Sequence, residues 1–264
     1  MERSVALPTG NVAVTQLGSG PPVVVLHRDV SVPGPSPFLE ALAEHHTVVA
    51  PQLPGFGTSD RPEWMRTVAQ LGVVTAHLLD ELGTGPCPLV GLGFGGWVAA
   101  DVATLGGGRL SALVLVSPFG VKPHAGEITD YALLSVTEYA ALGFHDSETY
   151  VALCGDEPDE DLLRAWDGAR EMVTRISWKP IGHSRALPPM LGLVDVPTLV
   201  VWGEDDAIVP RAAAQDWLEA LPQATSVVVP AVGHQVDLEA PTELADLVAE
   251  FVAKQAANSS TQSR

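Results

Sequence analysis

Val90-Gly91-Leu92-Gly93-Phe94-Gly95-Gly96-Trp97 is the stretch that predicts the fold of this 264-residue chain. An apolar run over residues 88–90 leads into it and indicates a buried strand. An Ala-rich apolar run over residues 97–103 follows it and indicates a buried helix. Glycine lets a backbone turn where other residues cannot. The stretch therefore predicts a strand, a very tight turn and a helix, with Gly93 at the apex of the turn.

The composition is that of an acidic globular protein. Apolar residues make up 46% of the chain, which supports a large core, and the formal net charge is −18. A charge of this sign makes nucleic acid an unfavourable partner and disfavours anionic membranes. The acidic run at residues 155–161 is interpreted as the solvated start of a helix. We expect a small-molecule substrate, no nucleic acid and no membrane among the partners.

The two cysteines, Cys87 and Cys154, do not make a disulfide framework, which fits a reduced, cytoplasmic setting. Cys87 lies in a strand-like run and is interpreted as a core residue. Neither a signal peptide nor a membrane-spanning run is recognised. The polar, aperiodic tail at residues 257–264 is predicted to be disordered.

Strand and helix patterns alternate along the chain, which is typical of a doubly wound α/β fold with a mostly parallel sheet. Short alternating runs at 5–7 and 12–14 predict an opening hairpin. Buried strands are predicted at 23–26, 47–50, 112–116, 198–202 and 226–229, and helices at 36–45, 68–82, 211–221 and 241–254.

The alternation stops between Phe119 and Met190. This segment has no buried strand run, and helical patterns such as the one over residues 160–176 dominate it. The sequence therefore predicts a core formed by residues 1–118 and 191–256, interrupted by a helical insertion at 119–190.

Two phrases after the insertion complete a family pattern. They are Trp202-Gly203-Glu204-Asp205-Asp206-Ala207-Ile208-Val209-Pro210 and Val232-Gly233-His234-Gln235-Val236-Asp237-Leu238-Glu239-Ala240-Pro241. Together with the tight turn, they resemble the α/β-hydrolase family over nearly the whole chain. In that family a G-x-S-x-G elbow is followed by an Asp and then a His. The resemblance implies an α/β-hydrolase fold with a helical cap.

The resemblance also implies catalytic roles for two side chains. Asp206 matches the acid of the family's triad and His234 matches its general base. Asp205 is the neighbouring alternative for the acid, but its spacing from Gly203 favours Asp206. An Asp beside an imidazole fixes the tautomer of the ring and stabilises its protonated form, so the pair suits proton transfer near neutrality.

The chain departs from the family pattern at the elbow, because Gly93 stands where the nucleophile is expected. The Phe94 N–H remains as a possible oxyanion donor. The loop after the third strand reads His27-Arg28 in place of His-Gly. Arg28 has two interpretations. Its side chain either pairs with an anionic group in the pocket or points to solvent, and the second is favoured. Gln52 also replaces an acid, in a loop whose role is mainly structural.

Further residues are candidates for the pocket. Ser117 ends a strand at the expected site, where it either lines the pocket or serves as a turn residue. His27 is expected near the oxyanion or substrate. Side chains of the insertion that could face a substrate are Tyr139, His145, Tyr150, Trp166, Trp178 and His183.

Three functions fit these residues. The first is an enzyme without a covalent intermediate, in which the His-Asp pair acts by general base catalysis on a small, largely apolar carbonyl compound as a lyase, isomerase, cyclase or water-activating hydrolase. The second is a ligand-binding protein without activity. The third is a serine esterase whose nucleophile has been replaced by Gly. No cofactor and no metal is expected, and a homodimer is possible.

Overall fold

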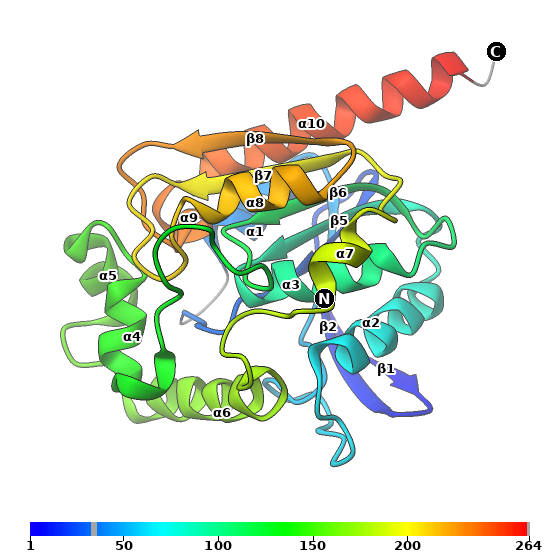
Figure 1. Cartoon of the computed structure of the whole chain (residues 1–264). Helices are drawn as coiled ribbons and strands as arrows, with labels where there is room; N and C mark the ends of the chain where they lie inside the picture. Colours follow the sequence, from blue (N-terminus) through cyan, green and yellow to red (C-terminus); the bar gives the residue numbers. More distant parts are fainter. Residues whose placement is uncertain (33–35, 263–264) are drawn as a thin grey trace.

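The computed structural model describes residues 1–32 and 36–262. Within these residues, eight strands form one sheet in the order β1-β2-β4-β3-β5-β6-β7-β8 (Figure 1). The strands are β1 (Glu2–Leu7), β2 (Gly10–Leu17), β3 (Pro22–Leu26), β4 (Thr47–Pro51), β5 (Cys87–Leu92), β6 (Leu110–Val116), β7 (Thr198–Gly203) and β8 (Ala224–Val229). The β1–β2 and β2–β4 pairs are antiparallel, and all others are parallel. The predicted α/β class, with its opening hairpin and mostly parallel sheet, is confirmed.

Side chains from the central strands pack on both faces of the sheet. Val23 and Val25 of β3 belong to the core against one face, whereas Val24 and Leu26 belong to the core against the other. Successive side chains of a strand point to opposite faces, so a strand covered on both sides needs an unbroken apolar run. This explains why β3, β5, β6 and β7 were recognisable from the sequence.

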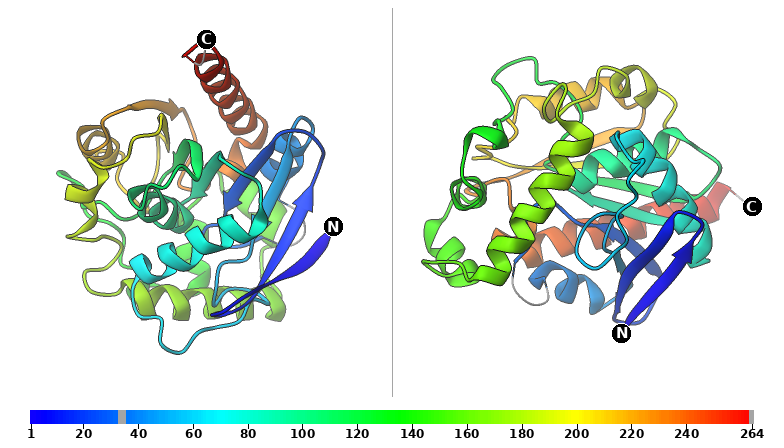
Figure 2. Two further views of the ribbon diagram at one scale, coloured as in Figure 1. Left: turned by 90° about the vertical axis from the view of Figure 1, so that its right-hand side faces the viewer. Right: turned by 90° about the horizontal axis from the view of Figure 1, so that it is seen from below.

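Helices cover each face of the sheet. The core of one face includes side chains of α1 (Pro37–Ala43) and α10 (Pro241–Gln262). The other face is covered by α2 (Val68–Leu82), α3 (Phe94–Thr104) and α8 (Ala213–Ala220). Figure 2 shows this layering from two further directions. Thr67 and Gln70 form a capping box at the start of α2, and Gly83 ends that helix at a φ of 66°.

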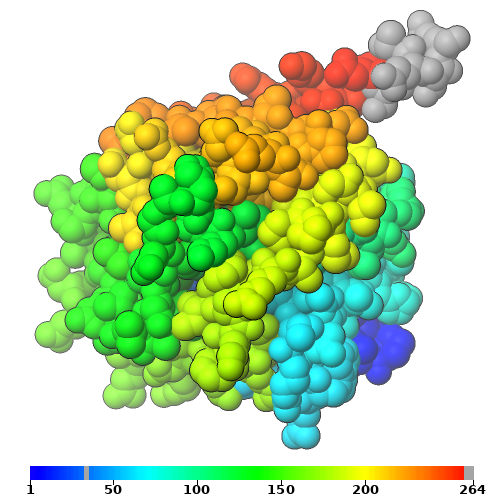
Figure 3. Space-filling view, in the orientation of Figure 1, coloured from blue at the N-terminus to red at the C-terminus, as the bar shows by residue number. Residues whose placement is uncertain are grey.

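The insertion between β6 and β7 contributes no strand of the sheet in the described part of the chain. It contains the short η1 (Tyr131–Leu133), α4 (Val136–Leu142), α5 (Ser147–Cys154), α6 (Glu160–Ser177) and α7 (Leu187–Leu191). Figure 3 shows the green and yellow-green surface of this segment over the lower left of the molecule. Helix α7, which lies inside the expected insertion range of 119–190, packs against α3 and α8 of the core.

Helix α10 continues to Gln262, which corrects the expected disorder for residues 257–262. Neither Gly nor Pro interrupts the segment after Pro241, so nothing in the backbone ends the helix where its apolar pattern stops. The last two residues of the predicted tail, 263–264, lie outside the described residues. Across the described chain, no helix combines the length and apolar character needed to cross a membrane.

Candidate active site

The tight turn between β5 and α3 places position 93 at the carboxyl end of the sheet. Gly93 has a φ of 51° and a ψ of −113°, a backbone conformation that L side chains rarely adopt. Its N–H donates to the Val116 carbonyl at 2.9 Å. A Cβ on Gly95 would lie 2.4 Å from the His27 carbonyl oxygen, so α3 approaches the end of β3 as only glycine permits. The elbow is therefore present without its reactive side chain.

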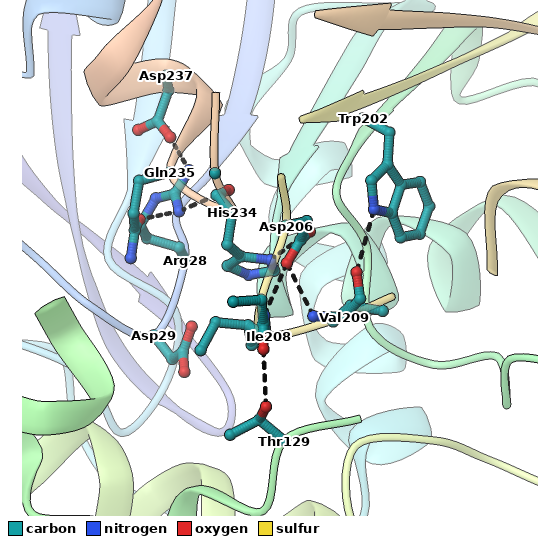
Figure 4. A network of polar contacts seen from close by, with 12 residues as sticks. Arg28, Asp29, Thr129, Trp202, Asp206, Ile208, Val209, His234, Gln235 and Asp237 are labelled. Atoms are coloured by element: carbon teal, nitrogen blue, oxygen red, sulfur yellow. Dashed lines mark hydrogen bonds and ion pairs between the residues drawn. The ribbon is translucent and has the colours of Figure 1, made fainter. Parts of the chain in front are cut away.

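His234 and Asp206 lie together, as Figure 4 shows. His234 Nδ1 is 2.9 Å from Asp206 Oδ2, and both side chains are buried. Asp206 Oδ1 accepts the N–H groups of Ile208 and Val209 at 2.9 and 2.8 Å, which fixes the carboxylate. Because Asp206 accepts from Nδ1, the lone pair of His234 lies on Nε2.

The His234 Nε2 atom faces position 93. A Cβ placed on Gly93 would be 3.2 Å from Nε2. Among the residues that the structure describes, this buried nitrogen has no hydrogen-bond partner. Asp205, the alternative acid, instead pairs with His145 at 3.1 Å in an exposed position. The geometry thus brings together the two residues expected from the sequence and leaves a basic nitrogen directed at the vacant place of the nucleophile.

Arg28 does not point to solvent, which corrects the favoured interpretation of this residue, and it borders a larger groove between the core and α6. Its side chain is buried and forms an ion pair with Asp237. The guanidinium also donates to the Gln235 side chain and, at 3.4 Å, to the His234 carbonyl. Burial lowers the pKa of Arg28 to about 10, so the group stays charged at neutral pH. Arg28 therefore joins the loop after β3 to the His234 loop.

His27 also differs from its expected role near the oxyanion or substrate. Its Nε2 accepts the Leu53 N–H at 2.9 Å, which places the ring proton on Nδ1, where it is donated to the Arg28 carbonyl at 2.6 Å. Burial lowers the pKa of His27, so the neutral ring is favoured. Both nitrogens are thus used to brace the loop after β3 against the Leu53 loop.

Phe94 supplies both a wall and a donor. Its ring is buried and lines a small space together with Trp97 and Phe119. The first N–H groups of a helix have no acceptor within the helix, and Phe94 is the first residue of α3. Its N–H is therefore in position to donate to a ligand at the elbow.

Ser117 is fully buried at the end of β6 and has a φ of 43°. Its N–H donates to the Val201 carbonyl at 2.8 Å, and its hydroxyl has no partner in the described part of the chain. Ser117 does not line the two small spaces beside Asp29. Its position is that of a turn residue beneath the site.

Asp29 is the site residue that the sequence analysis missed. It follows Arg28 on the loop after β3, is buried, and places Oδ1 3.9 Å from a Cβ built on Gly93. Tyr139 of α4 donates to Asp29 Oδ2 at 2.8 Å. Burial, followed by the nearby Asp29 carboxylate, raises the pKa of Tyr139 well above 10, so the phenol keeps its proton. A charged residue directly after a buried strand was the available signal.

The space around Asp29 is small and lined by aromatic side chains. On one side lies a cavity of about 10 Å³, no larger than a single water needs. Asp29 also borders a larger groove that runs toward α6, which neither His234 nor Gly93 lines. Of the other insertion candidates, Trp166 lines the small cavity and donates to the Ser31 carbonyl at 2.7 Å, while Trp178 is exposed.

Two further candidates lie away from the dyad. Tyr150 packs against Phe144, and His183 contacts the Ile181 carbonyl. The described residues contain no group of three or more His, Cys, Asp or Glu side chains arranged to hold a metal ion.

Comparison with known proteins gives a consistent match. The model of the family described as "Alpha/beta hydrolase family" matches residues 23–247. A dihydrolipoyllysine-residue acetyltransferase component of the acetoin cleaving system from Cupriavidus necator is 32% identical over 212 residues, which cover 76% of this chain and 55% of that protein. The chain thus spans little more than half the length of this relative.

Two other similar proteins match over most of their length. A 2-hydroxy-6-oxo-6-(2'-aminophenyl)hexa-2,4-dienoic acid hydrolase from Metapseudomonas resinovorans is 25% identical and covers 91% of this chain and 87% of its own. The solved structure of a bacterial membrane phospholipase A superposes with a TM-score of 0.80 at 20% identity, covering 97% of this chain and 86% of that one. The latter likeness concerns the fold alone.

Proposed function

Because the chain belongs to the alpha/beta hydrolase family, we propose that it is an enzyme in which His234 acts as a general base and no covalent intermediate forms at the elbow. The observation that carries this proposal is the unpartnered His234 Nε2, which faces the empty position above Gly93. The substrate is a small, largely apolar carbonyl compound, because the two spaces beside Asp29 are narrow and most of the side chains that line them are aromatic or aliphatic.

The geometry supports one sequence of proton transfer. His234 Nε2 takes a proton from a carbon next to the substrate carbonyl, and the electron pair of the broken C–H bond moves onto the carbonyl oxygen. Asp206 stabilises the imidazolium that results. The Phe94 N–H donates to the developing enolate oxygen. In an isomerisation the enolate then takes the proton back at another carbon. In an elimination the enolate expels a leaving group from the adjacent carbon, and the leaving group takes the proton from His234. In a cyclisation the enolate carbon bonds to a second carbonyl carbon of the same molecule, and the oxygen of that carbonyl takes the proton.

Magnitudes favour such a step over the hydrolysis of an unactivated ester. General base catalysis contributes about 10²–10⁴-fold, and an oxyanion donor about 10²–10³-fold. These factors suffice for an acidic C–H bond or an intramolecular reaction. Ester hydrolysis normally relies on a covalent nucleophile that divides the barrier, which Gly93 cannot supply. Hydrolysis by a water that His234 activates remains within the proposal, and the hydrolase among the relatives supports it.

One observation favours a second candidate function. A Cβ on Gly93 would lie close enough to His234 Nε2 for a serine hydroxyl to reach it. The scaffold therefore also suits a serine hydrolase whose nucleophile is replaced by Gly. A ligand-binding protein without activity is the third candidate, and the tests below separate the three.

The test is the exchange of C–H protons for deuterium in D₂O, followed by NMR on a panel of small ketones, aldehydes and esters. The wild-type protein should exchange protons next to a carbonyl, and His234→Ala should abolish the exchange. Asp206→Asn should lower it about 10²–10⁴-fold, because the imidazole loses its orientation and its counter-charge. Full exchange by His234→Ala would show that the dyad takes no part.

A second assay addresses the elbow. A fluorophosphonate probe should leave the wild-type protein unlabelled, and Gly93→Ser should not improve proton exchange. If Gly93→Ser instead turns an inert protein into a fast esterase on p-nitrophenyl acetate, the replaced-nucleophile function is correct.

A further inference from the structure

Asp29 is a buried carboxylate near a cation, Arg28, that is itself paired with another acid. It is 9% exposed, and none of the ion pairs formed by the described residues includes it. The nearby Arg28 is turned to Asp237. Tyr139 satisfies Oδ2 with one hydrogen bond. A buried carboxylate is costly unless it is paired and hydrogen-bonded, so Asp29 lacks the partner that would offset its burial.

Aromatic rings surround this carboxylate. Phe94, Trp97, Phe119 and Tyr131 line the space on the elbow side of Asp29. The Phe119 ring also packs edge-on against the His234 ring, with centroids 5.3 Å apart. Ring faces attract cations, most strongly where water is excluded. A carboxylate enclosed by aromatic rings is the chemistry that recognises an organic ammonium group.

The charged residues near the dyad also favour a cation. Asp29, Asp206 and Asp237 lie in this region with Arg28 as their nearby counter-charge. The whole chain carries a formal charge of −18, which attracts cations further. The second cation beside Asp29 is Arg170, which lines the cavity on the far side, between Tyr139 and Trp166, and donates to the Leu134 carbonyl. An ammonium group is therefore favoured on the elbow side, away from Arg170, where the space is closed in this structure and opens only when the insertion moves.

We propose that Asp29 and its aromatic surroundings bind an ammonium group of the substrate, which makes the substrate class a small amino-carbonyl compound. The position of Asp29 explains why this helps the reaction. A Cβ on Gly93 would lie 3.9 Å from Asp29 Oδ1 and 3.2 Å from His234 Nε2, so both groups reach the same space. An ammonium held by Asp29 presents the neighbouring carbon to Nε2. Its positive charge also acidifies that C–H bond and offsets the enolate.

The amine site uses the location of the proposed base but is tested by binding, without turnover. Butylamine, butanol and butyrate share one carbon chain and differ in charge at neutral pH. Each is titrated into the protein while tryptophan fluorescence is followed, since Trp97 and Trp166 line the spaces beside Asp29. Saturation-transfer NMR gives an independent reading. We expect butylammonium to bind at least tenfold tighter than butanol, and butyrate not to bind.

Variants assign the selectivity to Asp29. Asp29→Asn should weaken butylammonium binding at least tenfold and leave butanol binding unchanged. The matched control is Asp205→Asn, which removes an exposed carboxylate beside His145 and should change neither. Tyr139→Phe keeps the Asp29 charge and should keep the preference for the amine, which preserves the test if Asp29→Asn does not fold.

Three results would overturn the amine site. They are equal binding of amine and alcohol by the wild-type protein, amine binding that survives Asp29→Asn, and preferred binding of butyrate, which would indicate an anion site. His234→Ala should retain amine selectivity. The failure of the base and the failure of the amine site are therefore separate outcomes.

Discussion

Arg28 and Asp237 form a buried ion pair between the two loops that flank the dyad. Removing one member of such a pair leaves an unpaired buried charge, which costs about 3–5 kcal/mol, whereas replacing both members with apolar residues is often close to neutral. We expect Arg28→Met to lower the free energy of unfolding by about 3–5 kcal/mol. The double variant Arg28→Met/Asp237→Leu should recover most of this loss. Urea denaturation measures both.

A surface pair provides the control for this prediction. Arg109 contacts Asp80 at 2.8 Å with both side chains partly exposed. Exposed pairs contribute about 0–1 kcal/mol, so Arg109→Met should change stability little. If Arg28→Met is as mild as Arg109→Met, the buried pair does not hold the loops together.

These residues show what the sequence could and could not reveal. Asp206 and His234 were identifiable because each lies in a short local phrase, and the structure places them in contact. The partner of Arg28 was not, since Asp237 lies more than two hundred positions further along the chain and no local pattern links them. Asp29 was not predicted because the interpretation of this loop rested on its neighbour Arg28.

Helix α3 carries a buried acid, Asp101, on its face toward α2. The two helices approach so closely that a Cβ on Gly72 would lie 2.8 Å from Asp101 Cβ. Burial raises the pKa of Asp101 to about 7. In the unfolded chain the pKa is about 3.9. Between these two values the folded protein binds more protons than the unfolded chain, so stability falls as pH rises.

We therefore expect the free energy of unfolding to decrease between pH 5 and pH 8, with about 1–3 kcal/mol of the decrease due to Asp101. Asp101→Asn should remove this part, which denaturation curves at the two pH values will show. Asp246→Asn, which changes an exposed acid on α10, should keep the wild-type slope. An unchanged slope in Asp101→Asn would mean that the acid is already ionised at pH 5.

At the scale of helices and strands, the sequence predicted most of the elements. Strands such as β3 were visible because burial on both faces demands continuous apolar residues. The end of α10 was not, because the absence of an apolar pattern after Lys254 was read as disorder although nothing stops the helix there. Figures 1 and 2 show this part of α10 projecting from the body of the molecule.

For the molecule as a whole, the insertion is attached to the core around the dyad. Tyr139 of α4 donates to Asp29, Trp166 of α6 donates to Ser31, and the Gln235 N–H donates to the Gly143 carbonyl at 3.0 Å. The cavity of about 10 Å³ between insertion and core is too small for an organic substrate. An organic substrate can therefore enter this cavity only if the insertion moves.

The Tyr139–Asp29 hydrogen bond should oppose this movement. A hydrogen bond to a charged group contributes about 1.5–3 kcal/mol. We expect Tyr139→Phe to speed amide hydrogen exchange in α4 about tenfold or more, while β5 in the centre of the sheet exchanges as in the wild type. Hydrogen exchange followed by mass spectrometry resolves the two segments.

Tyr131→Phe is the control, because its hydroxyl contacts Ser177 within the insertion. Equal exchange of α4 in Tyr139→Phe and the wild type would show that this bond does not hold the insertion down.

The buried pair between Arg28 and Asp237 also constrains how the protein can evolve. A return to the family pattern would change Gly93 to Ser at the elbow and Arg28 to Gly in the loop after the third strand. Replacing Arg28 first leaves Asp237 buried without its counter-charge, and replacing Asp237 first leaves Arg28 in the same condition. Each single replacement therefore lowers the stability of the protein, whereas replacing both residues together does not. The ion pair therefore makes substitutions at positions 28 and 237 depend on each other, which hinders an evolutionary change to serine chemistry.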